Sequence, residues 1–327
     1  MYVKSTLTAL AIASLVATTG NAQTVGVAAS GQGSFTYGAA SAIAKVVSEN
    51  TDLQMRVQPT GGSNIWVPQL NAQAKDFGML ATYETWLANR GRLIYKKKHE
   101  NLRAVSVMAP LTPGLFVRKD SPYKKIGDLK GARVSSGFTT QKVIAEVIKG
   151  HLANAGLTYD DVKKVPAPNV VRAAGDFAQG KTDALFFALG SGKILQASAK
   201  VGGVRFLSLD PSPEAWKRLQ GVIPMAYQMH VKPAKRFHGV TAPSTAMAYD
   251  LLIITHANQS ADVVYKVTKA MHGNKKDMAA VFPVLKQFSQ KKMARRARFP
   301  TTRVRSSSIG KKGYGRPRID PGLNERR

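Results

Sequence analysis

Cysteine is absent from the 327-residue sequence. Disulfide bridges, thiolate zinc sites, cysteine nucleophiles and dithiol redox motifs are therefore all excluded. A chain without disulfides must be held together by burial of apolar surface, and this length is sufficient for that. It is also longer than one hydrophobic core usually serves, so we expect two domains or lobes.

The sequence also lacks an apolar run of the roughly 20 residues that a permanent membrane-spanning helix requires. Near the N-terminus, Lys4 precedes a shorter apolar stretch, Leu7–Thr19, and the small-residue run Gly20-Asn21-Ala22. This order is typical of an export signal. We expect residues 1–22 to be a signal peptide, cleaved near Ala22, and the mature protein to be soluble in the periplasm. An uncleaved anchor is the alternative.

Acidic residues are few, because 19 Asp and Glu stand against 48 Lys and Arg, a formal net charge of +29. Such an excess could bind nucleic acid, since basic clusters gain affinity by releasing counterions from phosphate. Part of it lies in the tail from Pro300 onward, and the rest is spread along the chain without interleaved aromatics on one helix face. We therefore expect a solvated basic surface and no nucleic-acid partner.

Catalytic and metal-binding motifs are missing as well. The six histidines show no H-E-x-x-H spacing, and no serine stands in G-x-S-x-G. The pair Asp160-Asp161 follows a helix-ending glycine, and we interpret it as the cap of the next helix rather than an acid/base pair. The sequence thus predicts no enzyme activity, no metal site and no cofactor.

What the sequence does contain is an alternation of short apolar strands with segments of helical periodicity. Strand Thr24–Ala29 is followed by helix Tyr37–Glu49, and a second set of the same kind begins after Ser121. This alternation predicts an α/β fold with parallel strands and crossover helices. We expect lobe 1 to comprise residues 23–116 and 246–299, and lobe 2 to comprise residues 117–245.

Three polar turns follow predicted strands, namely Ser30–Ser34, Thr60–Asn64 and Ser135–Thr140. The first begins like a dinucleotide-binding loop, but Thr36 replaces the third glycine, so a nicotinamide or flavin cofactor is not expected. What remains is exposed backbone N–H groups at helix N-termini, which favour a carboxylate or another anion. Ser63 is either a helix cap or a ligand contact. The turns should converge beyond the carboxyl ends of the strands.

Two short segments resemble each other. Leu70–Phe77 reads LNAQAKDF and Phe177–Ala184 reads FAQGKTDA, and each is predicted to be the end of a helix that turns into a strand. If the two lobes are structurally equivalent halves, these segments lie at matching places in them. Chance similarity is the alternative for so short a motif.

An ordered set of motifs resembles the TAXI family of TRAP transporter solute receptors. The set covers roughly residues 24 to 290, and its strength lies in its order rather than in any single motif. The motifs are Gly33–Gly38, Thr60–Asn64, Lys75–Gly78, Val117–Ser121, Asp128–Val134, Gly156-Leu157 with Asp160–Val162, Gly180–Ala184 and Val264–Ala270.

The resemblance implies a two-lobed periplasmic-binding-protein fold of type II, with mixed sheets flanked by helices, that closes on a small solute. It implies delivery of the solute to the membrane permease subunits of a TRAP transporter, and we expect the receptor to be a monomer. Carried over to this sequence, the ligand contacts are Ser34, Tyr37, Gly62, Ser63 and Asn64 in lobe 1 and Ser135, Gly137 and Thr139 in lobe 2, with Tyr83 and Phe187 as additional candidates.

Other functions use the same fold class. A receptor for an ATP-driven importer or a sensor is the nearest alternative, because one fold serves many functions. An α/β enzyme with a catalytic cleft is a different class, disfavoured here because no acid, base or nucleophile constellation is found. The solute itself is expected to be a small organic anion or an amino-acid-like molecule.

The resemblance ends shortly before Pro300. The family usually closes with a segment containing His-Pro-Gly-Ala, whereas residues 299–315 read FPTTRVRSSSIGKKGYG. We expect residues 300–327 to be a disordered basic tail, because Arg, Ser and Gly cannot replace an ordered closing segment.

We predict a frameshift shortly before Pro300, either in the natural gene or introduced when its sequence was determined. With permitted codons for residues 300–315, reading from the third base yields the peptide YHPGAIKFYREKGVW, which contains the missing motif. Determining the nucleotide sequence is the test. If the shifted frame does not encode this peptide, the frameshift is rejected.

Overall fold

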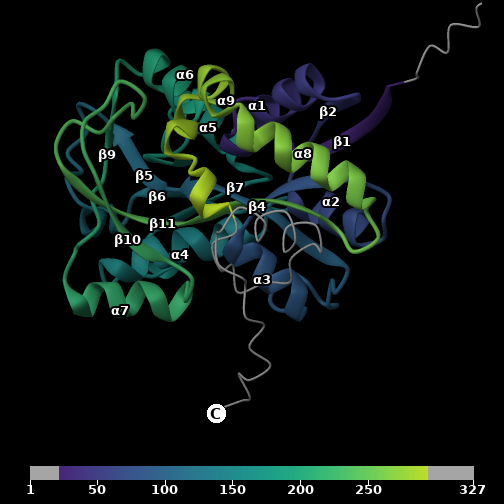
Figure 1. Cartoon of the computed structure of the whole chain (residues 1–327). Coiled ribbons are helices and arrows are strands. Elements are labelled where there is room, and N and C mark those ends of the chain that lie inside the picture. The colour runs from purple at the N-terminus through teal and green to yellow at the C-terminus, as the bar shows by residue number, and fades with distance from the viewer. Residues whose placement is uncertain (1–21, 294–327) are drawn as a thin grey trace, which may run out of the picture.

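The computed structural model describes residues 22–293, which form two β-sheets flanked by helices (Figure 1). The predicted signal peptide, apart from Ala22, and the predicted basic tail lie outside the described residues. The first sheet has the strand order β10-β11-β3-β1-β2, with β4 also paired to β11. Its strands are β1 (Gln23–Ser30), β2 (Leu53–Thr60), β3 (Phe77–Ala81), β4 (Leu102–Leu111), β10 (Tyr227–Val231) and β11 (Ser244–His256).

The helices of the first sheet lie on both of its faces. Strands β1, β2 and β3 are parallel, so each connection crosses over through a helix, and right-handed crossovers put α1 and α2 on opposite faces. Helix α1 packs against α8 and α9 (Figure 1). The helices are α1 (Phe35–Asn50), α2 (Ser63–Asn71), α3 (Thr82–Arg90), α8 (Ala261–Gly273) and α9 (Lys275–Val281), followed by the 3-10 turns η3 (Pro283–Gln287) and η4 (Gln290–Lys292).

The second sheet repeats this plan with the strand order β7-β6-β8-β5-β9. Its strands are β5 (Pro113–Arg118), β6 (Arg133–Gly137), β7 (Lys163–Ala167), β8 (Ala184–Ala188) and β9 (Val204–Phe206). Its helices are α4 (Val143–Asn154), α5 (Val170–Ala178), α6 (Gly192–Lys200) and α7 (Pro213–Val222), with 3-10 turns η1 (Ile126–Leu129) and η2 (Tyr159–Asp161). The predicted α/β class is confirmed.

The two resembling segments occupy equivalent places in the two sheets. One joins α2 to β3 and the other joins α5 to β8, and each of these strands pairs in parallel with the first strand of its set, β1 or β6. The shared aspartate has the same role in both, because Asp76 Oδ2 accepts a bond of 2.8 Å from Gly26 N and Asp183 Oδ2 accepts one of 2.7 Å from Arg133 N. Structural equivalence, rather than chance, explains the resemblance.

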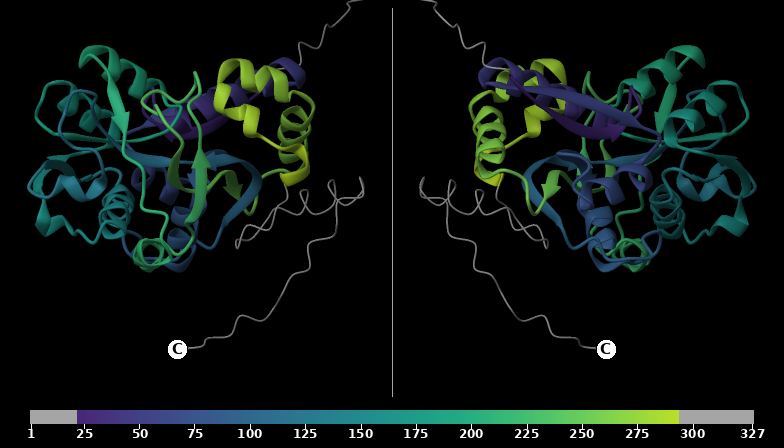
Figure 2. Two further views of the ribbon diagram at one scale, coloured as in Figure 1. Left: turned by 90° about the vertical axis from the view of Figure 1, so that its left-hand side faces the viewer. Right: turned by 90° about the vertical axis from the view of Figure 1, so that its right-hand side faces the viewer.

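The chain changes sheets at Thr112, which separates β4 from β5, slightly before the residue 116 expected from the sequence. It returns through β10, which pairs antiparallel with the start of β11. Figure 2 shows residues around 120–200 on one side of the molecule, the first and last described residues on the other, and strands between them. We use lobe 1 and lobe 2 for the two sheets with their helices; the exact division at 116 and 246 remains a proposal.

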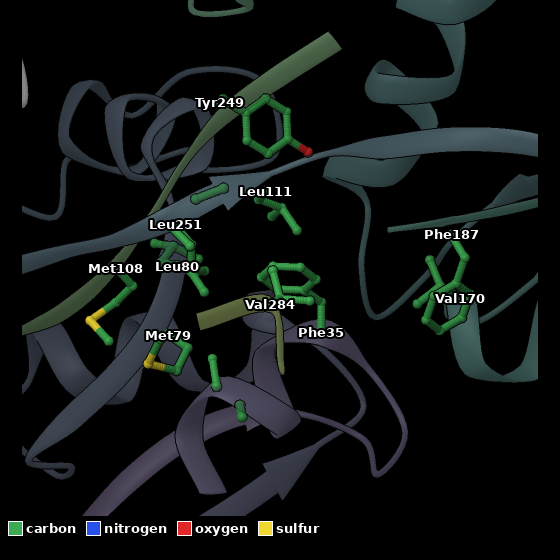
Figure 3. Packing of buried hydrophobic residues seen from close by; sticks show 14 of the residues in the cluster. Phe35, Met79, Leu80, Met108, Leu111, Val170, Phe187, Tyr249, Leu251 and Val284 are labelled. Carbon is green, nitrogen blue, oxygen red and sulfur yellow. The ribbon is translucent and has the colours of Figure 1, made fainter. Parts of the chain in front are cut away.

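Buried apolar side chains fill both lobes and form one continuous cluster. Phe35 and Val284 of lobe 1 lie near the middle of Figure 3, and Phe187 and Val170 of lobe 2 lie together at one side. Phe35 also packs edge-on against Phe282, with ring centroids 5.0 Å apart. Continuity of burial across the two lobes means that they pack directly against each other in this conformation.

Candidate functional site

The loops that follow the parallel strands of the two sheets meet between the lobes. In each sheet the strand order reverses beside its first strand, between β1 and β3 in lobe 1 and between β6 and β8 in lobe 2. Open α/β sheets bind ligands beyond the carboxyl ends of their strands at such a reversal. Here the two reversals face each other, and hydrogen bonds connect their loops directly.

Gln141 links three segments at this junction. Its side chain is buried, and its Nε2 donates a 2.9 Å hydrogen bond to Ser30 Oγ at the end of β1. Its Oε1 accepts a 2.9 Å bond from Val170 N at the start of α5. Because both ends of the amide are used, the Gln141 side chain holds the two lobes and the α5 N-terminus in one arrangement.

Three further hydrogen bonds connect the polar turns of lobe 1 with lobe 2. Each joins a loop or helix start of lobe 1 to a loop or helix start of lobe 2, and at least one backbone group takes part in every case. They are Thr140 Oγ1 to Gly61 O at 2.9 Å, Lys142 N to Asn64 Oδ1 at 3.3 Å, and Lys193 N to Gly33 O at 3.2 Å.

Gly62 lies at the closest approach. A Cβ built on Gly62 would lie 2.0 Å from the Thr140 carbonyl oxygen and 2.3 Å from Gln141 Cγ. Its φ of 166° is ordinary extended backbone, so the glycine is required by the neighbouring lobe rather than by its own conformation. A side chain at Gly62 would therefore keep the lobes apart.

The predicted lobe 1 residues are gathered at this junction, but several are already engaged. Ser34 caps α1, since its Oγ accepts a 3.2 Å bond from Tyr37 N. The N-cap of α2 is Gly62, not Ser63, so the capping interpretation of Ser63 is wrong. The Ser63 hydroxyl instead donates to the buried carboxylate of Glu84, which leaves its oxygen lone pairs as acceptors only.

The predicted lobe 2 residues differ in their exposure to solvent. Ser135 is buried in β6, and its carbonyl accepts a 3.2 Å bond from Tyr159 Oη. Gly137 adopts φ +78°, and the following Phe138 is fully buried at φ +49°. Thr139 is consequently exposed. The inserted Phe138 thus anchors the loop, and the cross-lobe contacts pass to Thr140 and Gln141.

Tyr83 and Phe187 are both buried. Tyr83 Oη donates a 3.3 Å hydrogen bond to Val222 O at the end of α7, so Tyr83 reaches lobe 2. Burial first, and then the Glu146 and Glu84 carboxylates, raise the pKa of Tyr83 to about 12. The phenol therefore stays a neutral hydrogen-bond donor. Phe187 lies in β8 beside Val170 (Figure 3).

Ser191 was missed by the sequence analysis. It stands at the N-cap of α6, just after β8, and is 1% exposed, yet its Oγ has no hydrogen-bond partner among the described residues. Gly190 before it has φ +83°. The run Leu189-Gly190-Ser191-Gly192 repeats the pattern of a polar glycine turn after a strand, and this signal could have identified it.

Glu84 was also missed. It is 7% exposed, and its Oε1 accepts hydrogen bonds from Ser63 Oγ and, at 2.9 Å, from Tyr95 Oη. Burial raises its pKa to about 7, although both hydrogen bonds act in the opposite direction. The start of α2 is therefore attached to a carboxyl group that titrates near neutrality.

A hollow of about 360 Å³ lies elsewhere, at β7 and α5, and includes none of the predicted ligand residues. It is lined by Val165, Pro166, Pro168, Arg172, Asp176 and Lys181. The buried Asp176 carboxylate is already paired with Arg172 at 3.5 Å and Lys181 at 3.3 Å. Because its charge is already compensated by two cations, we interpret this hollow as a structural feature of the surface and not as a solute site.

Within residues 22–293, no three His, Asp or Glu side chains are grouped in a way that could hold a metal ion. None of the helices in the same range is long and apolar enough to cross a membrane.

The sequence profile of the NMT1-like family matches residues 27–301. A structure of a periplasmic transporter is similar to this chain with a TM-score of 0.60 at 16% identity, covering 84% of this chain and 92% of that one. A structure from work on glutathione import through GshT and the cystine ABC importer TcyBC of Streptococcus mutans has a TM-score of 0.51 at 15% identity, covering 83% and 99%. These likenesses show the type II periplasmic-binding-protein fold.

We predict that Gly62→Ala shifts the molecule toward separated lobes. The added methyl group meets the Thr140 carbonyl only when the lobes are closed, so lobe 1 itself should fold normally. Small-angle X-ray scattering should give a larger radius of gyration than for the wild type. Gly127→Ala is the control, because a Cβ there meets nothing within 4 Å. Equal radii for all three proteins would contradict the prediction.

We also predict that Glu84→Gln reduces the loss of stability with rising pH. A carboxyl whose folded pKa exceeds its unfolded value stabilises the fold most below the unfolded pKa, and this contribution falls as pH rises to the folded pKa near 7. The loss is roughly 3 kcal/mol between about pH 4.5 and pH 8. Glutamine keeps an oxygen to accept both bonds, so denaturant unfolding should show a shallower decline.

The control is Glu214→Gln, on an exposed residue of α7. Burial lowers the pKa of His151, which makes the fold less stable as pH falls below the unfolded histidine pKa. His151 is present in every variant, so the difference between wild type and Glu84→Gln isolates the carboxyl group. Parallel pH profiles for these two proteins would refute the prediction.

Proposed function

Because the chain belongs to the NMT1-like family, we propose that it is an extracytoplasmic solute receptor, which binds a small molecule between its two lobes and delivers it to a membrane permease. The observation that carries this proposal is the direct meeting of loops from the carboxyl ends of both parallel strand sets. The facing loops are joined by single hydrogen bonds, so a hinge motion can part the lobes at these loops and close them again around a solute.

We propose a small organic anion or an amino-acid-like molecule as the solute. The N-termini of α1 and α6 are among those that lie at the junction of the lobes. Free backbone N–H groups and the helix dipole favour a negative charge there. The unpartnered hydroxyl of Ser191 supplies a further donor at the α6 N-terminus, where one carboxylate oxygen could accept from it.

Within this proposal, Ser34, Tyr37, Gly62, Ser63, Asn64, Tyr83, Ser135, Gly137, Thr139 and Phe187 remain candidate ligand contacts. Ser191 joins them, and Gln141 is assigned to closure of the lobes. Ser63 can serve only as an acceptor while its proton is donated to Glu84, so it suits an ammonium or hydroxyl group of the solute. A solute with both a carboxylate and such a donor could bind at the α6 N-terminus and at Ser63 at the same time.

For the transporter, we propose a TRAP permease of the TAXI type, on the ordered motifs of the sequence. A receptor of an ATP-driven importer is the second candidate, favoured by the similarity to the structure from the glutathione and cystine importer work. We further propose a periplasmic location after signal-peptide cleavage and a monomeric state. We propose neither enzyme activity nor nucleic-acid binding.

We predict that one solute from a panel of organic acids and amino acids raises the melting temperature without being turned over. The panel should include glutamate, 2-oxoglutarate, succinate and glutathione. Binding to the native state alone stabilises by about 2.7 kcal/mol at 100 times Kd. Ser191→Ala should reduce the shift for carboxylates, whereas Ser260→Ala, also an N-cap serine without a side-chain cap bond, should not. Turnover of a panel member would overturn the receptor proposal.

A further inference from the structure

The segment that follows α3 concentrates positive charge on a small surface. Five of the nine residues from Arg90 to Lys98 are basic, and none is acidic. The five side chains, Arg90, Arg92, Lys96, Lys97 and Lys98, all belong to exposed residues. Of these, only Lys98 has an acidic partner among the described residues, Glu100 at 3.9 Å, and both side chains are largely exposed. This group, called the basic loop below, therefore faces solvent with its charge nearly uncompensated.

An apolar side chain stands in the middle of the basic loop. Leu93 is 59% exposed, more than any other large hydrophobic residue that the structure describes. Its φ is +52°, in the left-handed region that a leucine rarely adopts. A leucine held in this conformation and turned toward water costs free energy in the isolated protein, which points to a partner that covers it.

An aromatic ring contacts two of the basic side chains of this segment. Trp86 of α3 is partly buried, and the guanidinium carbons of Arg90 and Arg92 lie 5.0 Å and 5.4 Å from its ring centroid. The two arginines are thus stacked on the tryptophan, which fixes the place of their charges on α3 and at the start of the basic loop. Tryptophan with flanking cations is typical of side chains placed at a membrane–water boundary.

The basic loop is held rigidly. Tyr95 is buried, and its hydroxyl donates to Glu84 at 2.9 Å. His99 N donates a 2.9 Å bond to Ala88 O, and Asn101 N donates a 3.0 Å bond to Asn71 Oδ1. Leu93 is therefore presented by a fixed frame on both sides, and binding would require little ordering of the chain.

We propose that the basic loop docks on an anionic phospholipid surface. Leu93 enters the boundary between headgroups and acyl chains, Trp86 lies at the headgroup level, and the five basic side chains contact lipid phosphates. A single exposed leucine with exposed basic residues on both sides of it in the sequence fits a lipid surface, which closes around it, whereas a protein partner would have to offer a matching pocket. The docking would hold the molecule beside the membrane, independently of any solute.

The absence of cysteine provides a sharp test in the full chain. Leu93→Cys, labelled with an environment-sensitive fluorophore, is mixed with vesicles of phosphatidylglycerol and phosphatidylcholine or of phosphatidylcholine alone. The label should shift to the blue and be quenched by nitroxide lipids only with phosphatidylglycerol, and added salt should reverse the effect. Because the label reports on position 93 itself, vesicle binding through other basic segments cannot imitate the result.

Leu195→Cys is the matched control. Leu195 is a second exposed leucine, at 49%, and lies on α6, which is at the upper edge of Figure 1 while α3 is at the lower edge. Its label should remain in water. If both labels respond equally, or if label 93 stays in water on protein-covered vesicles, the proposal is overturned.

A charge series completes the test. Replacing Lys96, Lys97 and Lys98 by serine should weaken insertion of label 93 on the order of a hundredfold. Replacing Lys124, Lys125 and Lys130, three exposed lysines of lobe 2, removes the same charge and should have a much smaller effect. If both triple replacements weaken insertion equally, the effect depends only on net charge, and a specific docking loop is rejected. A response of label 93 to an acidic polypeptide but not to vesicles would assign the loop to a protein partner instead.

Discussion

The arrangement of this molecule depends on the close approach of two backbones at Gly62 and Thr140. No side chain fits between them, since a Cβ on Gly62 would lie 2.0 Å from the Thr140 carbonyl. This approach lets the bonds of Gln141, Asn64 and Gly33 form across the junction. Because most of these partners are backbone groups or single amides, the contact is specific in geometry but modest in free energy. Such a contact is compatible with the proposed opening of the lobes.

The two lobes reach this junction by the same route. In each, a first strand is flanked by a second and a third parallel strand on opposite sides, which forces the loops to gather at the reversal. Asp76 and Asp183 fix the corresponding strands by accepting a hydrogen bond from the neighbouring backbone. Two halves of equal construction present their polar loops to each other, and the proposed site draws residues from both.

The sequence analysis located the junction better than it assigned individual side chains. Polar turns after strands were visible because glycine, serine and threonine cluster there, and the structure confirms that these turns lie together. Ser63 was open to a capping interpretation, but its hydroxyl is taken by Glu84, which is distant in sequence. Gln141 and Glu84 gave no local signal, since an isolated polar residue acquires its role only when its environment is buried. Thr139 is exposed because Phe138, next to it, turns inward.

By itself, the sequence determined the α/β class, the absence of thiol chemistry, the repeat of one strand–helix plan and the position of the polar turns. These properties follow from the periodicity and composition of residues that are close together in the sequence. Only the tertiary structure decided which turns touch across the lobes and which hydroxyls are already engaged. Those properties arise between residues far apart in the chain, and their energies depend on burial and distance, which no local pattern records.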